Sequence, residues 1–92
     1  MATFLLCGKY SSQALEQMSA QRTQQAVEAV QQCGGEVEAM YATLGQNDLL
    51  FIVSLPGIEE AMKASIALTK LTGIAFSTTP AIPVQDFDTL IG

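Results

Sequence analysis

The sequence predicts an α+β fold with the element order strand, helix, strand, strand, helix, strand. Three observations lead to this prediction. Two amphipathic helical segments each end at glycine, at Gly34 and at Gly73. Four short apolar or β-branched segments surround these helices, and a turn from Leu44 to Asp48 joins the middle two into a hairpin. Because crossovers are right-handed, we expect a ferredoxin-like four-stranded antiparallel sheet with two helices on one face.

The first half of the chain reads as a strand, a loop and a helix. Phe4 to Gly8 is short and apolar, which is typical of a buried strand. Ser11 or Ser12 in the loop that follows is expected to cap a short turn. Ser19 is then expected to cap the first long helix, from about Ala20 to Cys33.

The hairpin consists of a strand from Glu36 to Leu44 and a strand from Asp48 to Leu55. Strict alternation along the first of these would place Val37, Ala39, Tyr41 and Thr43 on one face. The second has apolar residues at every position from Leu49 to Val53, so it is apolar on both faces.

The second half begins with a helix from Ile58 to Thr72 and continues with a strand from Ile74 to Thr79. Pro80 and Pro83 are expected to stop regular pairing. Residues 80–92 form a C-terminal tail whose apolar residues Phe87, Leu90 and Ile91 suggest docking on the partner subunit.

A two-faced apolar sheet has a consequence for assembly. Ninety-two residues make one domain, 1–92, with helices for only one face of the sheet. Leu50 and Ile52 would then lie in water, which forfeits about 1.5–3 kcal/mol for each large apolar side chain. Hydrophobic residues make up 49% of the chain and charged residues only 14%. We therefore expect a homodimer through stacked sheet faces, a dimeric α/β barrel.

Composition also excludes several classes of partner and site. The net charge is −5, and the four basic residues form no cluster, so neither nucleic acid nor an anionic membrane is an expected partner. The chain lacks histidine, so no metal site and no cofactor are expected. Two cysteines, Cys7 and Cys33, without a signal segment indicate reduced thiols in a cytoplasmic protein.

The hairpin sequence from Tyr41 to Leu50 resembles the signature of GYD-domain proteins, in which Thr-Leu-Gly-x-Tyr-Asp runs into an apolar strand. Gly45 and Asp48 match this motif, and Asn47 stands where the family has tyrosine. The resemblance covers about Thr3 to Pro80 and implies a dimeric α/β barrel. A similar turn occurs in the effector-binding domain of Lrp/AsnC regulators, which bind amino acids near subunit interfaces. Cofactor-independent monooxygenases share the barrel.

Candidate ligand-binding residues lie around the hairpin turn and at the end of the first strand: Lys9, Tyr10, Tyr41, Gly45, Asn47 and Asp48. Each also has a structural interpretation. Gly45 would supply a positive φ and Asp48 would bond the turn backbone. Lys9 and Tyr10 would be loop residues near a cavity between the sheet and the helices, and Tyr41 would be a core ring with its hydroxyl at the rim.

The leading functional hypothesis is a homodimeric sensory or accessory module that binds a small apolar or amino-acid-like molecule. A cofactor-independent oxygenase or isomerase using Asp48, Tyr41 or Tyr10 is the alternative, and the lack of histidine argues against it. A purely structural subunit without a pocket is the third hypothesis.

Overall fold

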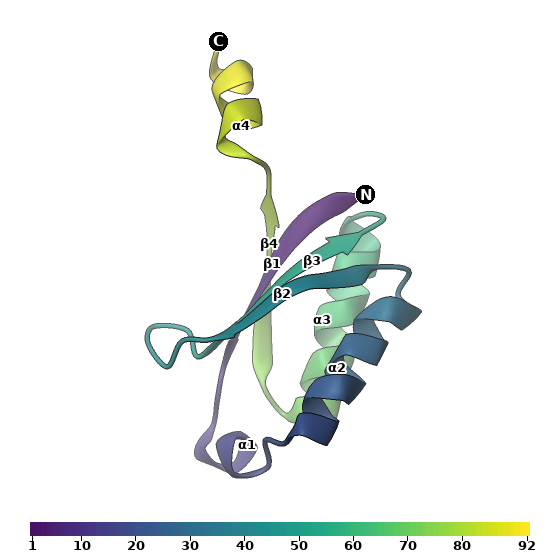
Figure 1. Ribbon diagram of the computed structural model, residues 1–92, viewed down its shortest axis with the longest axis vertical. Helices are drawn as coiled ribbons and strands as arrows, with labels where there is room; N and C mark the ends of the chain where they lie inside the picture. Colours follow the sequence, from purple (N-terminus) through teal and green to yellow (C-terminus); the bar gives the residue numbers. More distant parts are fainter.

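The computed structural model describes residues 1–92, and its fold is the predicted α+β arrangement (Figure 1). The elements in chain order are β1 (Ala2–Lys9), α1 (Ser12–Glu16), α2 (Ala20–Gln32), β2 (Glu36–Ala42), β3 (Leu49–Leu55), α3 (Ile58–Thr72), β4 (Ala75–Ala81) and α4 (Val84–Ile91). The strands form one antiparallel sheet in the order β2-β3-β1-β4. Helices α2 and α3 lie on the same face of this sheet (Figure 1).

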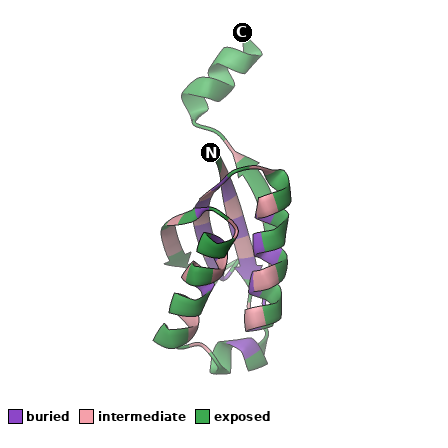
Figure 2. Cartoon of the chain, turned by 90° about the vertical axis from the view of Figure 1, so that its right-hand side faces the viewer, coloured by how far each residue is buried: buried purple, intermediate pink, exposed green.

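The core lies between the sheet and these two helices, where Figure 2 shows most of the buried positions. Alternate residues of β1 and β3 point into it, among them Leu6 and Val53, both fully buried. Helix α3 contributes Ala61, Ala64 and Leu68, all fully buried. Small alanines on the inner side let the helix approach the sheet closely.

Local signals in the sequence set the helix boundaries. The side chain of Ser19 accepts a hydrogen bond from the backbone N–H of Arg22 at 3.1 Å and caps α2. Ser11 caps α1 in the same way through the N–H of Ala14, at 3.0 Å. Gly73 closes α3 in the left-handed conformation, with φ at 72°.

The alternation predicted along β2 is wrong beyond its second residue. A β-bulge between Val37 and Ala39 inserts one extra residue, so every later side chain changes face. Val37 and Met40 therefore both lie on the helix side, where Met40 pairs with buried Phe51. Ala39 and Tyr41 lie on the open side. The strand also ends at Ala42, two residues earlier than predicted.

Pro80 does not end β4, contrary to the sequence prediction. It lies inside the strand and is the register partner of Phe4. Strand β4 is at the edge of the sheet, and an edge strand leaves one side of its backbone unpaired. A residue without an N–H is tolerated at such a position.

The open face of the sheet carries an apolar patch on its two central strands. Leu5 of β1 is paired with Ile52 of β3, and Cys7 is paired with Leu50. We call these four half-buried side chains the open-face patch. No helix of the chain covers it.

The C-terminal tail forms helix α4, which stands away from the body of the molecule (Figure 1). None of its residues is buried, and the whole chain measures 47 × 29 × 18 Å. None of the helices is both long enough and apolar enough to span a bilayer.

Candidate functional site

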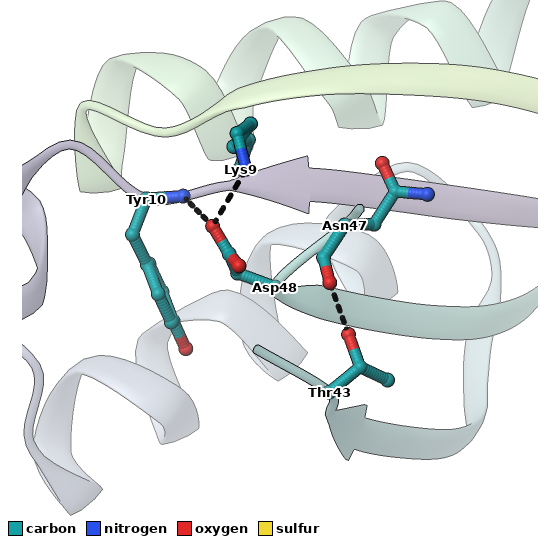
Figure 3. A network of polar contacts seen from close by, with 5 residues as sticks. All are labelled: Lys9, Tyr10, Thr43, Asn47 and Asp48. Atoms are coloured by element: carbon teal, nitrogen blue, oxygen red, sulfur yellow. Dashed lines mark hydrogen bonds and ion pairs between the residues drawn. The ribbon is translucent and has the colours of Figure 1, made fainter. Parts of the chain in front are cut away.

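Asp48 connects the hairpin to the end of β1 (Figure 3). It precedes β3, and only 9% of its surface is exposed. Its carboxylate Oδ2 accepts a hydrogen bond from the backbone N–H of Tyr10 at 3.0 Å. Its own N–H donates to the carbonyl oxygen of Gly8 at 2.8 Å. The side chain thus bonds the loop after β1, whereas the sequence suggested that it would bond its own turn.

Lys9 is the only cation near this carboxylate. Its Nζ lies 3.7 Å from Oδ2 of Asp48, and its side chain is 65% exposed. Water screens such a pair, so its contribution to folding is only a few tenths of a kcal/mol. The amine therefore remains accessible from solvent.

Tyr10 packs its ring against the core and lies next to the same carboxylate. Burial raises the pKa of its phenol above the ordinary value of 10.0, and the negative charge of Asp48 raises it further. The hydroxyl is therefore protonated at neutral pH. In that state it can donate a hydrogen bond but is a poor general base.

The turn between β2 and β3 is closed by backbone bonds. The Gly45 N–H donates to the carbonyl oxygen of Asn47 at 2.9 Å, and the Thr43 hydroxyl donates to the same oxygen. Leu44, with φ at 51°, is the residue in the left-handed region. The expectation that Gly45 supplies the positive φ is therefore wrong, because the left-handed residue of the turn is Leu44, one residue earlier.

A shallow depression of about 260 Å³ lies on the open face beside this turn. Its lining combines the turn with the open-face patch and consists of Cys7, Thr43, Gly45, Gln46, Asn47 and Leu50. Two of the predicted site residues, Gly45 and Asn47, are among them. Tyr41 is the register partner of Leu50 and is 56% exposed, so it is not the core ring that the sequence suggested.

Cys7, Thr43, Gln46 and Leu50 line the depression but did not stand out in the sequence as site residues. Cys7 is half-buried on the open face. The register of β1 against β3 brings it beside Leu50. A single sequence carries no signal for that register.

The core between α2 and the sheet offers no comparable room. The void there, bordered by Met40, Phe51 and Ile74, has a volume of about 20 Å³. That is enough for about one water molecule. Neither Lys9 nor Tyr10 lines any cavity of the structure, so the cavity anticipated near them is not found.

A polar recess of about 190 Å³ lies between α1, the start of α2 and the end of α3. Arg22 and Lys70 line it. The Arg22 guanidinium donates to the carbonyl oxygen of Leu71 and to Oε1 of Gln17, at 3.2 Å for the latter. These bonds hold the three segments together and indicate a structural role for Arg22. No local motif in the sequence predicts this role.

The predicted site residues thus fall into two sets. Lys9, Tyr10 and Asp48 form a network at the end of β1. Gly45 and Asn47 line the depression, and Tyr41 lies beside it. No cluster of three potential metal ligands occurs in the chain.

The fold resembles that of the crystal structure of the Mycobacterium tuberculosis leucine response regulatory protein, LrpA. The TM-score is 0.59 at 10% sequence identity, and the match covers 89% of this chain and 51% of that one. The chain therefore spans about half the length of that protein, and the likeness concerns the fold.

No curated protein matches the sequence. The GYD domain family, by contrast, matches residues 4–91, nearly the whole chain. This match covers the six-element core, the hairpin signature and α4 together, and it confirms the resemblance seen at the turn from Thr43 to Asp48. The chain belongs to the GYD domain family.

Proposed function

We propose that this chain is a cytoplasmic homodimeric module that binds a small molecule, in a sensory or accessory role. Two copies stack their open sheet faces, and the ligand lies in the depression beside the hairpin turn. The uncovered open-face patch is the observation that carries the proposal.

The open-face patch supplies the driving force for dimer formation. Leu5, Leu50 and Ile52 are large apolar side chains on the two central strands, with no helix above them. Fully covering a side chain of this size contributes about 1.5–3 kcal/mol. A second sheet is the natural cover, since it presents the same patch across a two-fold axis.

The depression has a mixed lining that suits a ligand with a polar head and an apolar body. The Gln46 and Asn47 side-chain amides can donate and accept hydrogen bonds, and the Thr43 hydroxyl, which donates to the carbonyl oxygen of Asn47, can accept one. Leu50 and Cys7 form the apolar part. An amino acid such as leucine fits this description, and LrpA, which shares the fold, is named a leucine response regulatory protein.

The oligomeric state tests the first half of the proposal. Multi-angle light scattering at micromolar concentration is expected to give twice the chain mass. The substitution Leu50→Lys places a charge in the open-face patch and is expected to give monomer. Leu15→Lys is the matched control, because Leu15 is 52% exposed on α1, away from the sheet. A monomeric wild-type chain would refute the proposed assembly.

A ligand screen tests the second half. Thermal shifts are measured for the wild-type chain against amino acids, quinones and acyl compounds. A hit is expected to disappear in Asn47→Ala, which changes the lining, and to persist in Gln24→Ala, which changes an exposed position on α2. A panel without any hit would argue for a structural subunit. A hit that Asn47→Ala leaves unchanged would refute the depression as the ligand site.

A further inference from the structure

Helix α4 has an apolar side that nothing in its own chain covers. Val84, Phe87, Leu90 and Ile91 are between 53% and 76% exposed. Their spacing places them within one third of the helix circumference. Asp86 and Asp88 border this apolar side, one on each flank. A helix of eight residues is marginal in water on its own, so its stability depends on packing against another surface.

A complementary groove lies between α3 and the edge strand β4. It has a volume of about 260 Å³ and is lined by Ser65, Ile66, Thr69, Lys70 and Phe76. Met62 and Ile58 continue it along α3 at intervals of four residues, and both are more than half exposed. We call this surface the α3/β4 groove.

We propose that α4 of one copy docks in the α3/β4 groove of a second copy. This inference rests on the proposed homodimer and identifies a second contact within it. The lengths agree: Met62 to Lys70 spans about 12 Å along α3, and α4 is about 12 Å long.

The charges of the two surfaces are also complementary. Lys63 and Lys70, two of the four basic residues of the chain, lie along one side of the α3/β4 groove. Helix α4 carries Asp86 and Asp88 beside its apolar side and no basic residue. The acidic residues of α3, Glu59 and Glu60, lie one turn from Lys63 and about three turns from Lys70, so the charge complementarity rests mainly on Lys70.

The geometry of the chain favours a second copy over a fold-back onto the same chain. Only Ile82 and Pro83 connect β4 to α4, and the proline fixes its own φ. The part of the groove lined by Lys70 and Phe76 lies at the start of β4, about 20 Å from Ile82 at the rise of an extended strand. Since α4 is about 12 Å long, a fold-back would cover Ile58 and Met62, which lie at the Ile82 end of α3, and would end short of Phe76.

A two-fold dimer removes this difficulty. An axis that crosses the strands between two stacked sheets sets the two β4 strands antiparallel, one over the other. The end of one β4 then lies near the start of the other, where Phe76 and the groove are found. A change of direction at Ile82 and Pro83 then lays α4 in the partner's groove, starting from its Phe76 end.

Disulfide trapping between two different chains tests the inference. Both natural cysteines are first replaced, Cys7→Ser and Cys33→Ser, and single cysteines are then introduced as Leu90→Cys in one chain and Thr69→Cys in the other. Mild oxidation of the mixture is expected to give a 69–90 link, identified by peptide mass spectrometry. The control Gln85→Cys, on the opposite side of α4, is expected to link several-fold less. Absence of the link, or equal linking by the control, would overturn the inference.

A chain with both Leu90→Cys and Thr69→Cys tests for the fold-back. A link within one chain, seen as a faster monomer band on a non-reducing gel, would also overturn it. Charge reversal supplies a second readout. Lys70→Glu is expected to weaken the dimer by about tenfold, and adding Asp86→Lys and Asp88→Lys in the same chain is expected to restore it.

These outcomes separate the two proposals. If light scattering shows a dimer but the 69–90 link does not form, docking of α4 is refuted and the proposal of stacked sheets is retained. Formation of the link in Leu50→Lys chains that remain dimeric supports docking of α4 and refutes the stacked sheets.

Discussion

Within the family signature, Asp48 is the residue that connects the hairpin to β1 by hydrogen bonds. Its carboxylate accepts from the N–H of Tyr10, and its N–H donates to the carbonyl of Gly8. The two ends of one residue therefore hold the hairpin against β1. The exposed ion pair with Lys9 adds little, since water screens it. Asp48 stabilises the fold mainly because its carboxylate accepts a hydrogen bond from the backbone N–H of Tyr10, in the loop that follows β1.

Removing that acceptor is expected to destabilise the fold. Asp48→Ala leaves the partly buried N–H of Tyr10 without its partner, so the free energy of unfolding should fall by about 1–2 kcal/mol. Asp48→Asn keeps an acceptor oxygen and should cost less than about 1 kcal/mol. Urea denaturation at one fixed protein concentration measures both. Glu28→Ala, at an exposed position of α2, is the control and should change stability by less than about 0.5 kcal/mol.

Tyr10 makes stability depend on pH in the alkaline range. Because its folded-state pKa is raised above 10.0, the unfolded chain loses the phenol proton first as the pH rises. The free energy of unfolding should therefore be constant with respect to this group below about pH 9 and fall as the pH rises past about 10. Tyr10→Phe should remove this part of the fall, and Tyr41→Phe should leave it. Equal alkaline profiles for the wild type and Tyr10→Phe would contradict this assignment.

Contacts between elements depend on close approach at particular glycines. Gly35 lies buried where the chain passes from α2 into β2. A Cβ at this position would collide with the carbonyl oxygen of Ser54 and the side chain of Leu55. Backbone cannot yield as a flexible side chain can, so the start of β2 could not keep its place beside β3. Gly45 differs, because a Cβ there would meet only the carbonyl oxygen of Asn47, at 3.9 Å.

The two glycines should therefore respond differently to alanine. Gly35→Ala is expected to lower the free energy of unfolding by about 2–3 kcal/mol, the cost of forcing extra volume into packed structure. Gly45→Ala is expected to change it by less than about 0.5 kcal/mol, since φ at Gly45 is not positive and the space is open. Thermal or urea unfolding of the two variants side by side decides the matter, and equal losses would be inconsistent with the structure.

The whole molecule is a sheet with one covered face and one open face. Helices α2 and α3 fill the covered side, where the remaining void holds about one water. The open side presents the open-face patch and the depression, and α4 projects beyond the body (Figure 1). Both uncovered apolar surfaces belong to the same chain, so one two-fold partner can cover them together.

Dimer formation of this kind links folding to concentration. The Tm of the wild-type chain should rise as protein concentration rises, because association stabilises the folded state by mass action. The Tm of Leu50→Lys should not depend on concentration, and that of Leu15→Lys should rise as the wild type does. Differential scanning calorimetry over a hundredfold range of concentration measures all three. A concentration-independent wild-type Tm would contradict the proposed dimer.

Local chemistry in the sequence determined most elements of this protein, but helix α4 was not predicted within the C-terminal tail. The serine caps at Ser11 and Ser19, the terminating Gly73 and the period of α3 each act within a few residues, so their effects can be read without a structure. The apolar stretch from Leu49 to Val53 likewise predicted a sheet with two apolar faces. These features were sufficient for the fold class.

The tertiary structure decided what depends on register. The bulge after Val37 moved Tyr41 to the open face, and the pairing of β1 with β3 brought Cys7 beside Leu50 at the depression. The edge position of β4 made Pro80 acceptable within a strand. A one-residue shift in pairing reverses the face of every later side chain. The site therefore depends on contacts between distant segments, which the order of residues alone does not display.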